Sequence, residues 1–255
     1  MNQINVEIQQ PAINKLGAQS IIDFYRTLAI NELCFTGLSA FVTGDTSSAL
    51  NVVIDTQDNN HWDEKKAHEI TNFFQSYQVP WCILVTSISK TKNLEDLNFK
   101  LTYRDPSMYF DLSQDLPSTI NIDIKEETDD LLNWVEPERE GFPSSDNCET
   151  YRKLNAELLK KGEKKLRHFT AYENNEPISS GTLFLSDNAV MIHNLATKNK
   201  FRRQGVASAL TQYMMQEAKK LNYRHCFLDS SADGVNLYRK LGFKIYCITS
   251  VYEMS

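Results

Sequence analysis

The chain has 255 residues, of which 41% are hydrophobic and 24% charged, which is the composition of an ordinary globular protein with enough apolar residues for a buried core. Its formal net charge of −6 argues against nucleic acid bound through a basic surface, and no stretch approaches the roughly 18 apolar residues of a membrane span. Its five scattered cysteines, without a CxxC pair, argue against a disulfide framework or a zinc site. The first segment lacks the apolar core of a signal peptide. From these two observations we expect a cytoplasmic protein.

The first half of the chain alternates helical and strand-like segments. Apolar periodicity predicts a helix over 21–33, a strand over 50–55, a helix over 67–77, a strand over 80–87, a short helix over 93–99 and strands over 100–105 and 107–112. A polar stretch that contains Pro117 follows at 113–121 and marks a break. We therefore predict two domains, residues 1–116 and residues 117–255.

The second half predicts a longer series of elements. They are helices over 126–135 and 146–161, a hairpin over 167–185 with a polar turn at Asn174 and Asn175, a strand over 189–197, a helix from Val206, a strand over 224–230, a helix over 233–243 and a final strand. This order is typical of an α/β domain with a mixed, mostly antiparallel sheet flanked by helices. Ligands of such domains bind where a strand gives way to a helix N-terminus.

Acidic and basic residues are unevenly distributed along the chain. Residues 1–118 hold 14 acids and 8 bases, a net charge of −6, whereas residues 119–255 hold 19 of each, a net charge of 0. The second half is therefore the better host for an anionic ligand.

Residues 194–215 join a strand to a helix through a basic turn. A helix N-terminus presents unpaired N–H groups and about half a positive charge. Gly205, Ala207 and Ser208 let a bulky anion approach that backbone closely. The turn also supplies four cationic side chains, Lys198, Lys200, Arg202 and Arg203. Together these features predict a pyrophosphate-binding site.

This turn is not one of the two common phosphate loops, because neither Gly-Lys-Ser/Thr nor GxGxxG occurs in it. A basic turn before a helix is, by itself, more typical of a solvated loop. Its position between a strand and a helix favours a ligand site, and so does a second pattern at a fitting distance, LDSSADGVNLYRKLGFK at 228–244.

The two patterns together resemble the GNAT acetyltransferase superfamily. In that family, a strand of the form L-x-V leads into [QR]-x-x-G-x-[GA], and a helix reading L-Y-x-x-x-G-F follows. The matching residues here are Leu195-Ala196-Thr197, then 202–207, then Leu237-Tyr238 and Leu241-Gly242-Phe243. The element order of residues 120–255 also matches the fold of the family, so the resemblance covers slightly more than half of the chain.

The resemblance implies that the protein binds acetyl-CoA as its acyl donor, and we expect no metal. The backbone of Leu195 and Thr197 would pair with the pantetheine arm, and Arg202 and Arg203 would face the phosphates. Ser231 stands where many members have an asparagine that contacts the cofactor, so that contact is weakened or missing here. The implied cofactor-binding residues are Leu195, Ala196, Thr197, Arg202, Arg203, Gln204, Gly205, Val206, Ala207, Ser208 and Ser231.

The resemblance also implies a general acid. Tyr238 falls at the position of the tyrosine that protonates the departing thiolate. A phenol has a pKa near ~10 and a thiol near ~8.5, so this transfer costs only roughly 2 kcal/mol. Packing in the core is the alternative role of this tyrosine.

The general base is less well marked. Members of the family often carry a glutamate on the strand before the phosphate loop, but His193 is the only titratable side chain between residues 189 and 197. His193 is therefore the candidate base, although a histidine in a strand is more often structural. Glu173 and Glu253 have no better support.

Residues 50–112 follow the strand and helix order of the second half. Their turn at 56–66 has no glycine and no paired arginines, and it carries Asp58 and Asp63, which would repel a phosphate. The segment resembles the N-terminal portion of tandem GNAT proteins. That resemblance implies a degenerate partial copy without a cofactor, which completes the sheet or walls the acceptor cleft.

We therefore expect an N-acetyltransferase in which an amine, on a small molecule or a peptide, attacks the thioester directly. The expected assembly is a monomer or homodimer, with no nucleic-acid or membrane partner. Two other functions remain open: a catalytically silent acyl-CoA sensor, and an interaction protein whose basic turn binds a partner. Thiol release with a panel of amines, and calorimetry with CoA, distinguish the three.

Overall fold

The computed structural model describes residues 5–56, 62–86, 92–118, 120–141 and 148–254. The chain forms two compact units, Met1–Ser107 with Ile245–Ser255, and Met108–Lys244. This division differs from the predicted boundary after residue 116. The difference arises because one long strand runs through residues 107 and 108 without a break, and because the last strand of the chain groups with the first unit.

The first unit is built on a mixed sheet with the strand order β1-β2-β3-β4-β11-β5. Its elements are α1 (Pro11–Leu28), β1 (Asn31–Phe35), β2 (Leu38–Val42), β3 (Val52–Asp55), α2 (Glu64–Ser76), β4 (Cys82–Val85), α3 (Lys92–Asp96), β5 (Phe99–Asp111) and β11 (Lys244–Met254). β3 and β4 are parallel, whereas β1–β2, β2–β3 and β4–β11 are antiparallel. Trp62, Phe74 and Phe99 belong to the core of this unit.

The second unit has the strand order β5-β10-β9-β8-β7-β6, to which β5 contributes its last residues. Its elements are β6 (Asp123–Glu127), α4 (Leu132–Gly141), α5 (Cys148–Lys160), β7 (Leu166–Glu173), β8 (Glu176–Leu185), β9 (Val190–Thr197), α6 (Val206–Lys220), β10 (His225–Asp229) and α7 (Val235–Lys240). β6 to β9 pair in antiparallel fashion, and β9 and β10 are parallel. The predicted fold class, a mixed and mostly antiparallel sheet flanked by helices, is confirmed.

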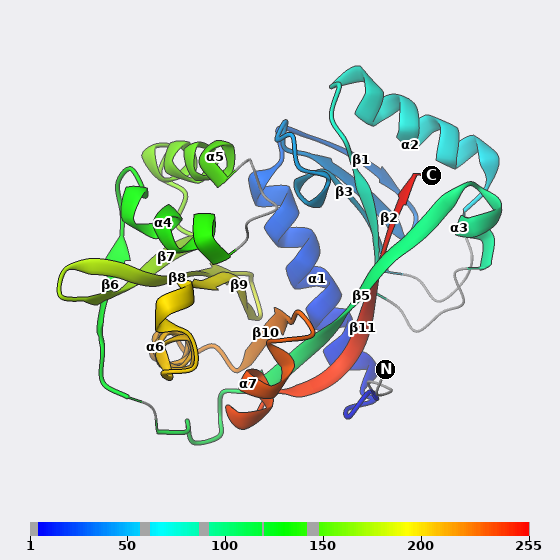
Figure 1. Ribbon diagram of the computed structural model, residues 1–255. Helices are drawn as coiled ribbons and strands as arrows, with labels where there is room; N and C mark the ends of the chain where they lie inside the picture. The colour runs from blue at the N-terminus through cyan, green and yellow to red at the C-terminus, as the bar shows by residue number, and fades with distance from the viewer. Residues whose placement is uncertain (1–4, 57–61, 87–91, 119, 142–147, 255) are drawn as a thin grey trace. The chain divides into compact units, whose positions relative to one another are not determined.

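The sheet of the second unit has two unlike faces, because successive side chains of a strand point to opposite sides. Phe169 of β7 packs on Tyr213 of α6, with ring centroids 5.5 Å apart. The preceding residue, His168, packs on Trp134 of α4 at 4.9 Å. α4 and α5 therefore cover one side of β7, β8 and β9, and α6 covers the other (Figure 1).

Several predicted elements need correction. The helix predicted over 21–33 ends at Leu28, and residues 31–33 lie in β1, so the β1–β2 hairpin was missed. The helix predicted over 126–135 is wrong at its start, because Glu126 and Glu127 lie in β6 and α4 begins at Leu132. The two strands predicted over 100–112 are one strand, β5. Residues 57–61 of the acidic turn lie outside the described residues.

Candidate functional site

β9 is interrupted by a bulge at Asn194. Ser180 of β8 pairs with Ala196, and Thr182 pairs with His193, so the single residue between them, Gly181, faces two residues of β9. Asn194 adopts a positive φ of 53° there. A bulge disrupts the ladder and turns the strand locally, so the second half of β9 takes a new direction.

Beyond the bulge, β9 also no longer pairs with its other neighbour, β10. β10 pairs with β9 only from Val190 to Ile192. Among the described residues, no strand pairs with residues 193–197 on that side. Such an unpaired edge offers backbone N–H and C=O groups to an extended ligand.

The turn after β9 leads directly into α6. A short 3₁₀ helix, Asn199–Phe201, is followed by Arg203 with φ 63° and Gly205 with φ 87°. Gly205 is the N-cap of α6 and has a left-handed backbone conformation that other residues adopt at a cost. The glycine is therefore required by the backbone at this position.

A run of amide groups at this helix start has no acceptor among the described residues. Ala209 is the first residue of α6 whose N–H bonds to a carbonyl of the preceding turn, Gly205 O at 3.0 Å. For the amides of residues 203–208, the described part of the chain provides no acceptor. No acidic residue lies in the first turn of α6. This is the arrangement that binds phosphate groups at helix N-termini.

The cations of the turn fall into two pairs. Lys198 and Lys200 both contact Glu176, at 3.4 and 2.9 Å, so their charge is partly compensated. Arg202 and Arg203 are exposed, and neither pairs with a carboxylate of the described residues. The Arg202 Nε donates to Thr197 O at 3.1 Å, which holds this guanidinium beside the end of β9.

Ser231 and Tyr238 follow β10. Because β9 and β10 are parallel, the segments that follow them lie at the same edge of the sheet. Ser231 is exposed, and its carbonyl accepts from the Gly234 amide at 3.0 Å. Tyr238 of α7 is 8% exposed and packs edge-on against Phe243, and none of the described residues hydrogen-bonds its hydroxyl. Burial raises the pKa of this phenol above its ordinary value of 10.0, so it is protonated at neutral pH.

His193 lies directly before the bulge on the side of the sheet that α4 covers. It pairs across the strands with Thr182, which in turn pairs with His168. Its Nε2 is buried, and desolvation lowers the pKa of its imidazole to about 3. An imidazole with that pKa is a poor proton acceptor near neutral pH.

Glu138 of α4 is not marked by any pattern in the sequence. It is 2% exposed, and desolvation raises the pKa of its carboxyl to about 8, against the effect of a hydrogen bond with Asn194. α4 lies close to β9, since a Cβ added to Gly141 would be 2.9 Å from the Ala196 Cβ. No local signal distinguishes Glu138 from its acidic neighbours Glu136 and Glu140, so only the packing of α4 reveals it.

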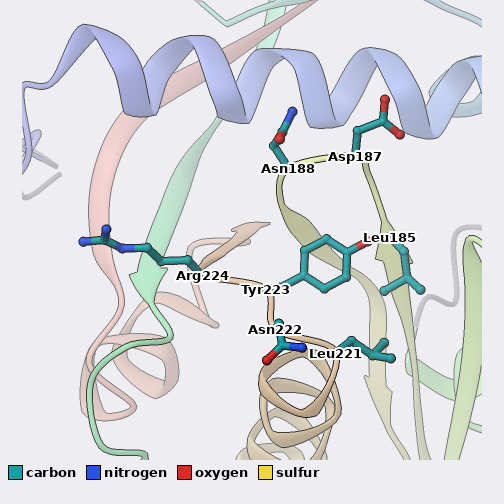
Figure 2. A pocket seen from close by; sticks show the side chains of 7 residues that line it. All are labelled: Leu185, Asp187, Asn188, Leu221, Asn222, Tyr223 and Arg224. Atoms are coloured by element: carbon teal, nitrogen blue, oxygen red, sulfur yellow. The ribbon is translucent and has the colours of Figure 1, made fainter.

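A separate hollow of about 490 Å³ lies at the other end of these strands (Figure 2). It is lined by Asp187 and Asn188 before β9 and by Asn222 and Tyr223 before β10. These residues precede the two parallel strands, whereas the amide run follows β9, so the hollow does not belong to the candidate site. Within the described residues, no group of three or more His, Cys, Asp or Glu is placed to hold a metal ion, and no helix has the length and apolar character needed to cross a bilayer.

Comparison with known proteins identifies a family and related folds. Residues 128–243 match the model of the acetyltransferase (GNAT) family. The fold is similar to that of a GCN5-related N-acetyltransferase from Kribbella flavida, with a TM-score of 0.71, 11% identity and 95% of each chain covered. A functionally unknown conserved protein from Staphylococcus epidermidis has a TM-score of 0.64 at 12% identity, over 88% of this chain and 94% of its own.

The similarity in fold also extends over the first half of the chain. A tandem GNAT protein of the clavulanic acid biosynthesis pathway has a TM-score of 0.59 at 9% identity, and the match covers 96% of this chain and 89% of that protein. No curated protein sequence matches the chain. At these identities the matches establish a shared fold, including a module before the segment that matches the family model.

Proposed function

We propose, from the premise that residues 128–243 belong to the acetyltransferase (GNAT) family, that this protein transfers an acetyl group from acetyl-CoA to an amine. The observation that carries the proposal is the run of amide groups over residues 203–208, for which the described residues provide no acceptor. Six N–H donors can hydrogen-bond the oxygen atoms of a diphosphate, and the two exposed arginines beside them can balance its negative charge.

The unpaired edge of β9 supports the placement of the donor. An extended pantetheine arm would pair with Leu195 and Thr197 as an added strand, with Ala196 between them, and its diphosphate would lie on the amides of Arg203 to Ser208. The thioester would then lie near the bulge at Asn194. Ser231 would be a minor contact at the same edge of the sheet.

The proposed reaction is direct attack of the amine on the thioester carbonyl. Tyr238 would protonate the departing thiolate, since its phenol carries a proton at neutral pH. Because its pKa is raised, Tyr238 gives up its proton at a higher free-energy cost than a free phenol does. We therefore expect the proton to move to the sulfur while the C–S bond breaks, and not after a free thiolate has formed. A small-molecule or peptide acceptor, a monomeric or homodimeric assembly and a cytoplasmic setting belong to the same proposal.

The proposal is tested with two glycines that share one backbone conformation. Gly205 and Gly162 both have a φ of 87°. An alanine strains the backbone at either position by about 1–2 kcal/mol, but only Gly205 lies in the amide run. We expect Gly205→Ala to weaken CoA binding at least tenfold in calorimetry, and Gly162→Ala to bind as the wild type does.

Turnover separates the proposed enzyme from its alternatives. Thiol release from acetyl-CoA should depend on an added amine and should fall with Gly205→Ala. CoA binding without thiol release for any amine would identify a silent acyl-CoA sensor. Absence of heat with CoA would instead favour an interaction protein, and it would refute the proposed site.

A further inference from the structure

α4 carries three acidic residues, and one of them differs from the others. Glu136 pairs with Arg139, and Glu140 accepts a hydrogen bond from the Asn199 amide at 3.1 Å. Glu138 is buried, and the described residues give its Oε1 no hydrogen bond. Burying a carboxyl oxygen without a donor costs free energy, so this arrangement points to a use other than stability.

A chain of hydrogen bonds fixes this carboxyl at the bulge of β9. The Tyr151 hydroxyl of α5 donates to Asn194 Oδ1 at 3.0 Å, which leaves the amide nitrogen of Asn194 as the donor to Glu138. Asn194 itself is held by the bulge, with its positive φ. Its neighbours in β9, His193 and Leu195, are half-buried like Asn194, so the bulge is partly exposed to solvent.

The face of the sheet toward α4 carries further buried polar groups. On the face of the sheet toward α4, His168 Nδ1 contacts Thr182 Oγ1 at 2.9 Å. Within the described residues, no partner is present for His168 Nε2, Thr170 Oγ1 or Ser180 Oγ. Three buried polar atoms in this position are suited to hydrogen-bond an entering polar molecule or ordered water.

We propose that Glu138 is the general base of the acetyl transfer, and that its Oε1 takes the proton of the acceptor amine, directly or through one water. The proposal rests on the proposed function, which places the thioester beside Asn194. As the C–N bond forms and the C–S bond breaks, one N–H proton passes to the Glu138 carboxylate, and the thiolate takes the Tyr238 proton. Solvent then returns a proton from Glu138 to Tyr238, so that protons balance over the cycle.

The protonation behaviour of the nearby groups supports Glu138 over His193. The elements that pack against α4 carry several titratable or charged side chains, among them His168 and Tyr172 on β7, Glu176 on β8, His193 on β9, and Cys148, Glu149, Tyr151 and Arg152 on α5. Desolvation lowers the pKa of each imidazole to about 3 and raises that of Glu138 to about 8. A base with a pKa near the operating pH is the more effective one.

The test compares Glu138→Gln with two other variants. Glu136→Gln changes an exposed carboxylate of the same helix and is the matched control, and His193→Gln removes the rival base. We expect E138Q to lower kcat by ~100-fold or more, with CoA affinity in calorimetry within twofold of the wild type. In the wild type, kcat/KM should rise with pH through about 8 as Glu138 ionises, and in E138Q this step should be absent.

Glu138→Asp keeps the carboxyl group, so it is the control for a loss of activity that comes from misfolding alone. It should retain the step in the pH profile at a reduced rate. A kcat for E138Q within threefold of the wild type, or loss of the step in His193→Gln instead, would overturn the assignment while leaving the transferase intact. A wild-type protein that binds CoA but releases no thiol with any amine would refute the proposed function and the base together.

Discussion

Glu138 also links folding to pH. Its carboxyl has an ordinary pKa of 4.5 and a pKa of about 8 in the folded protein, because burial disfavours the charged form. Between these two values the folded state holds more protons than the unfolded chain, so the free energy of unfolding falls as the pH rises. The stabilising effect of the neutral form is fully present below the lower value and is lost as the pH rises through the higher one.

Replacement of Glu138 by Gln should therefore change the pH dependence of stability. At ~1.4 kcal/mol per pKa unit, the largest effect is on the order of 5 kcal/mol. E138Q should match the wild type near the lower pKa value and should be more stable above the higher one. Urea unfolding at pH 5 and pH 9 measures the difference, and Glu136→Gln should behave as the wild type. If the free energy of unfolding changes with pH in the same way for E138Q and wild type, then folding does not hold the Glu138 carboxyl in its neutral form.

Tyr238→Phe tests the proposed acid at the scale of one atom. The ring packs against Phe243, and no described residue bonds the hydroxyl, so its removal should leave the thermal midpoint nearly unchanged. We expect kcat to fall by ~100-fold, the usual range for loss of a general acid, with little change in CoA affinity. A kcat within threefold of the wild type would return Tyr238 to a packing role.

At the scale of one element, Gly17 lets α1 pack closely against Tyr246 of β11. A Cβ added to Gly17 would lie 2.2 Å from the Tyr246 Oη and 2.7 Å from its Cζ. Tyr246 is buried, so its ring has little room to move. Gly17→Ala should therefore destabilise the first unit by about 1–3 kcal/mol, despite the better helix propensity of alanine.

The midpoint of urea unfolding, followed by circular dichroism, measures this effect. The double variant Gly17→Ala with Tyr246→Leu should recover part of the loss, because the shorter side chain removes the overlap. An unchanged midpoint for Gly17→Ala alone would mean that α1 can shift away from β11 at little cost in stability.

Elements with a strong local pattern were predicted well. The hairpin over 167–185 is confirmed as β7 and β8, and Asn174 and Asn175 take the positive φ that its tight turn requires. The polar residues of β6 were interpreted as the start of a helix, because an exposed edge strand such as Asp123–Glu127 has no apolar alternation. Its pairing with β7, a long-range contact, determines its structure.

At the scale of the whole molecule, the last strand belongs to the first unit. β11 lies between β4 and β5 in that sheet, and its residues also bond to the beginning of the chain, with the Glu7 amide donating to Ile245 O at 2.7 Å. Deletion of residues 245–255 should therefore disrupt the first unit, although the segment that matches the family model, 128–243, stays complete.

Hydrogen exchange measures the consequence of that deletion. The amides of β4, 82–85, should lose protection in the chain that ends at residue 244, because their neighbouring strand is gone. Retained protection there would show that the first unit folds without β11. The fragment 117–255, the domain predicted from the sequence, should be poorly stable for a related reason, since it contains β11 without β4.

The sequence by itself predicts a phosphate-binding turn at residues 202–208, because a glycine, small residues and arginines before a helix form a local pattern. The structure places that glycine at the N-cap of α6, with a φ of 87°. The tertiary structure alone decided the other half of the candidate site. Burial and pKa of Glu138 and His193 depend on which helix covers which strand, and the unpaired edge of β9 depends on where β10 stops pairing. Those are relations between segments distant in the chain, and the free energy of a buried charge is set by such neighbours rather than by adjacent residues.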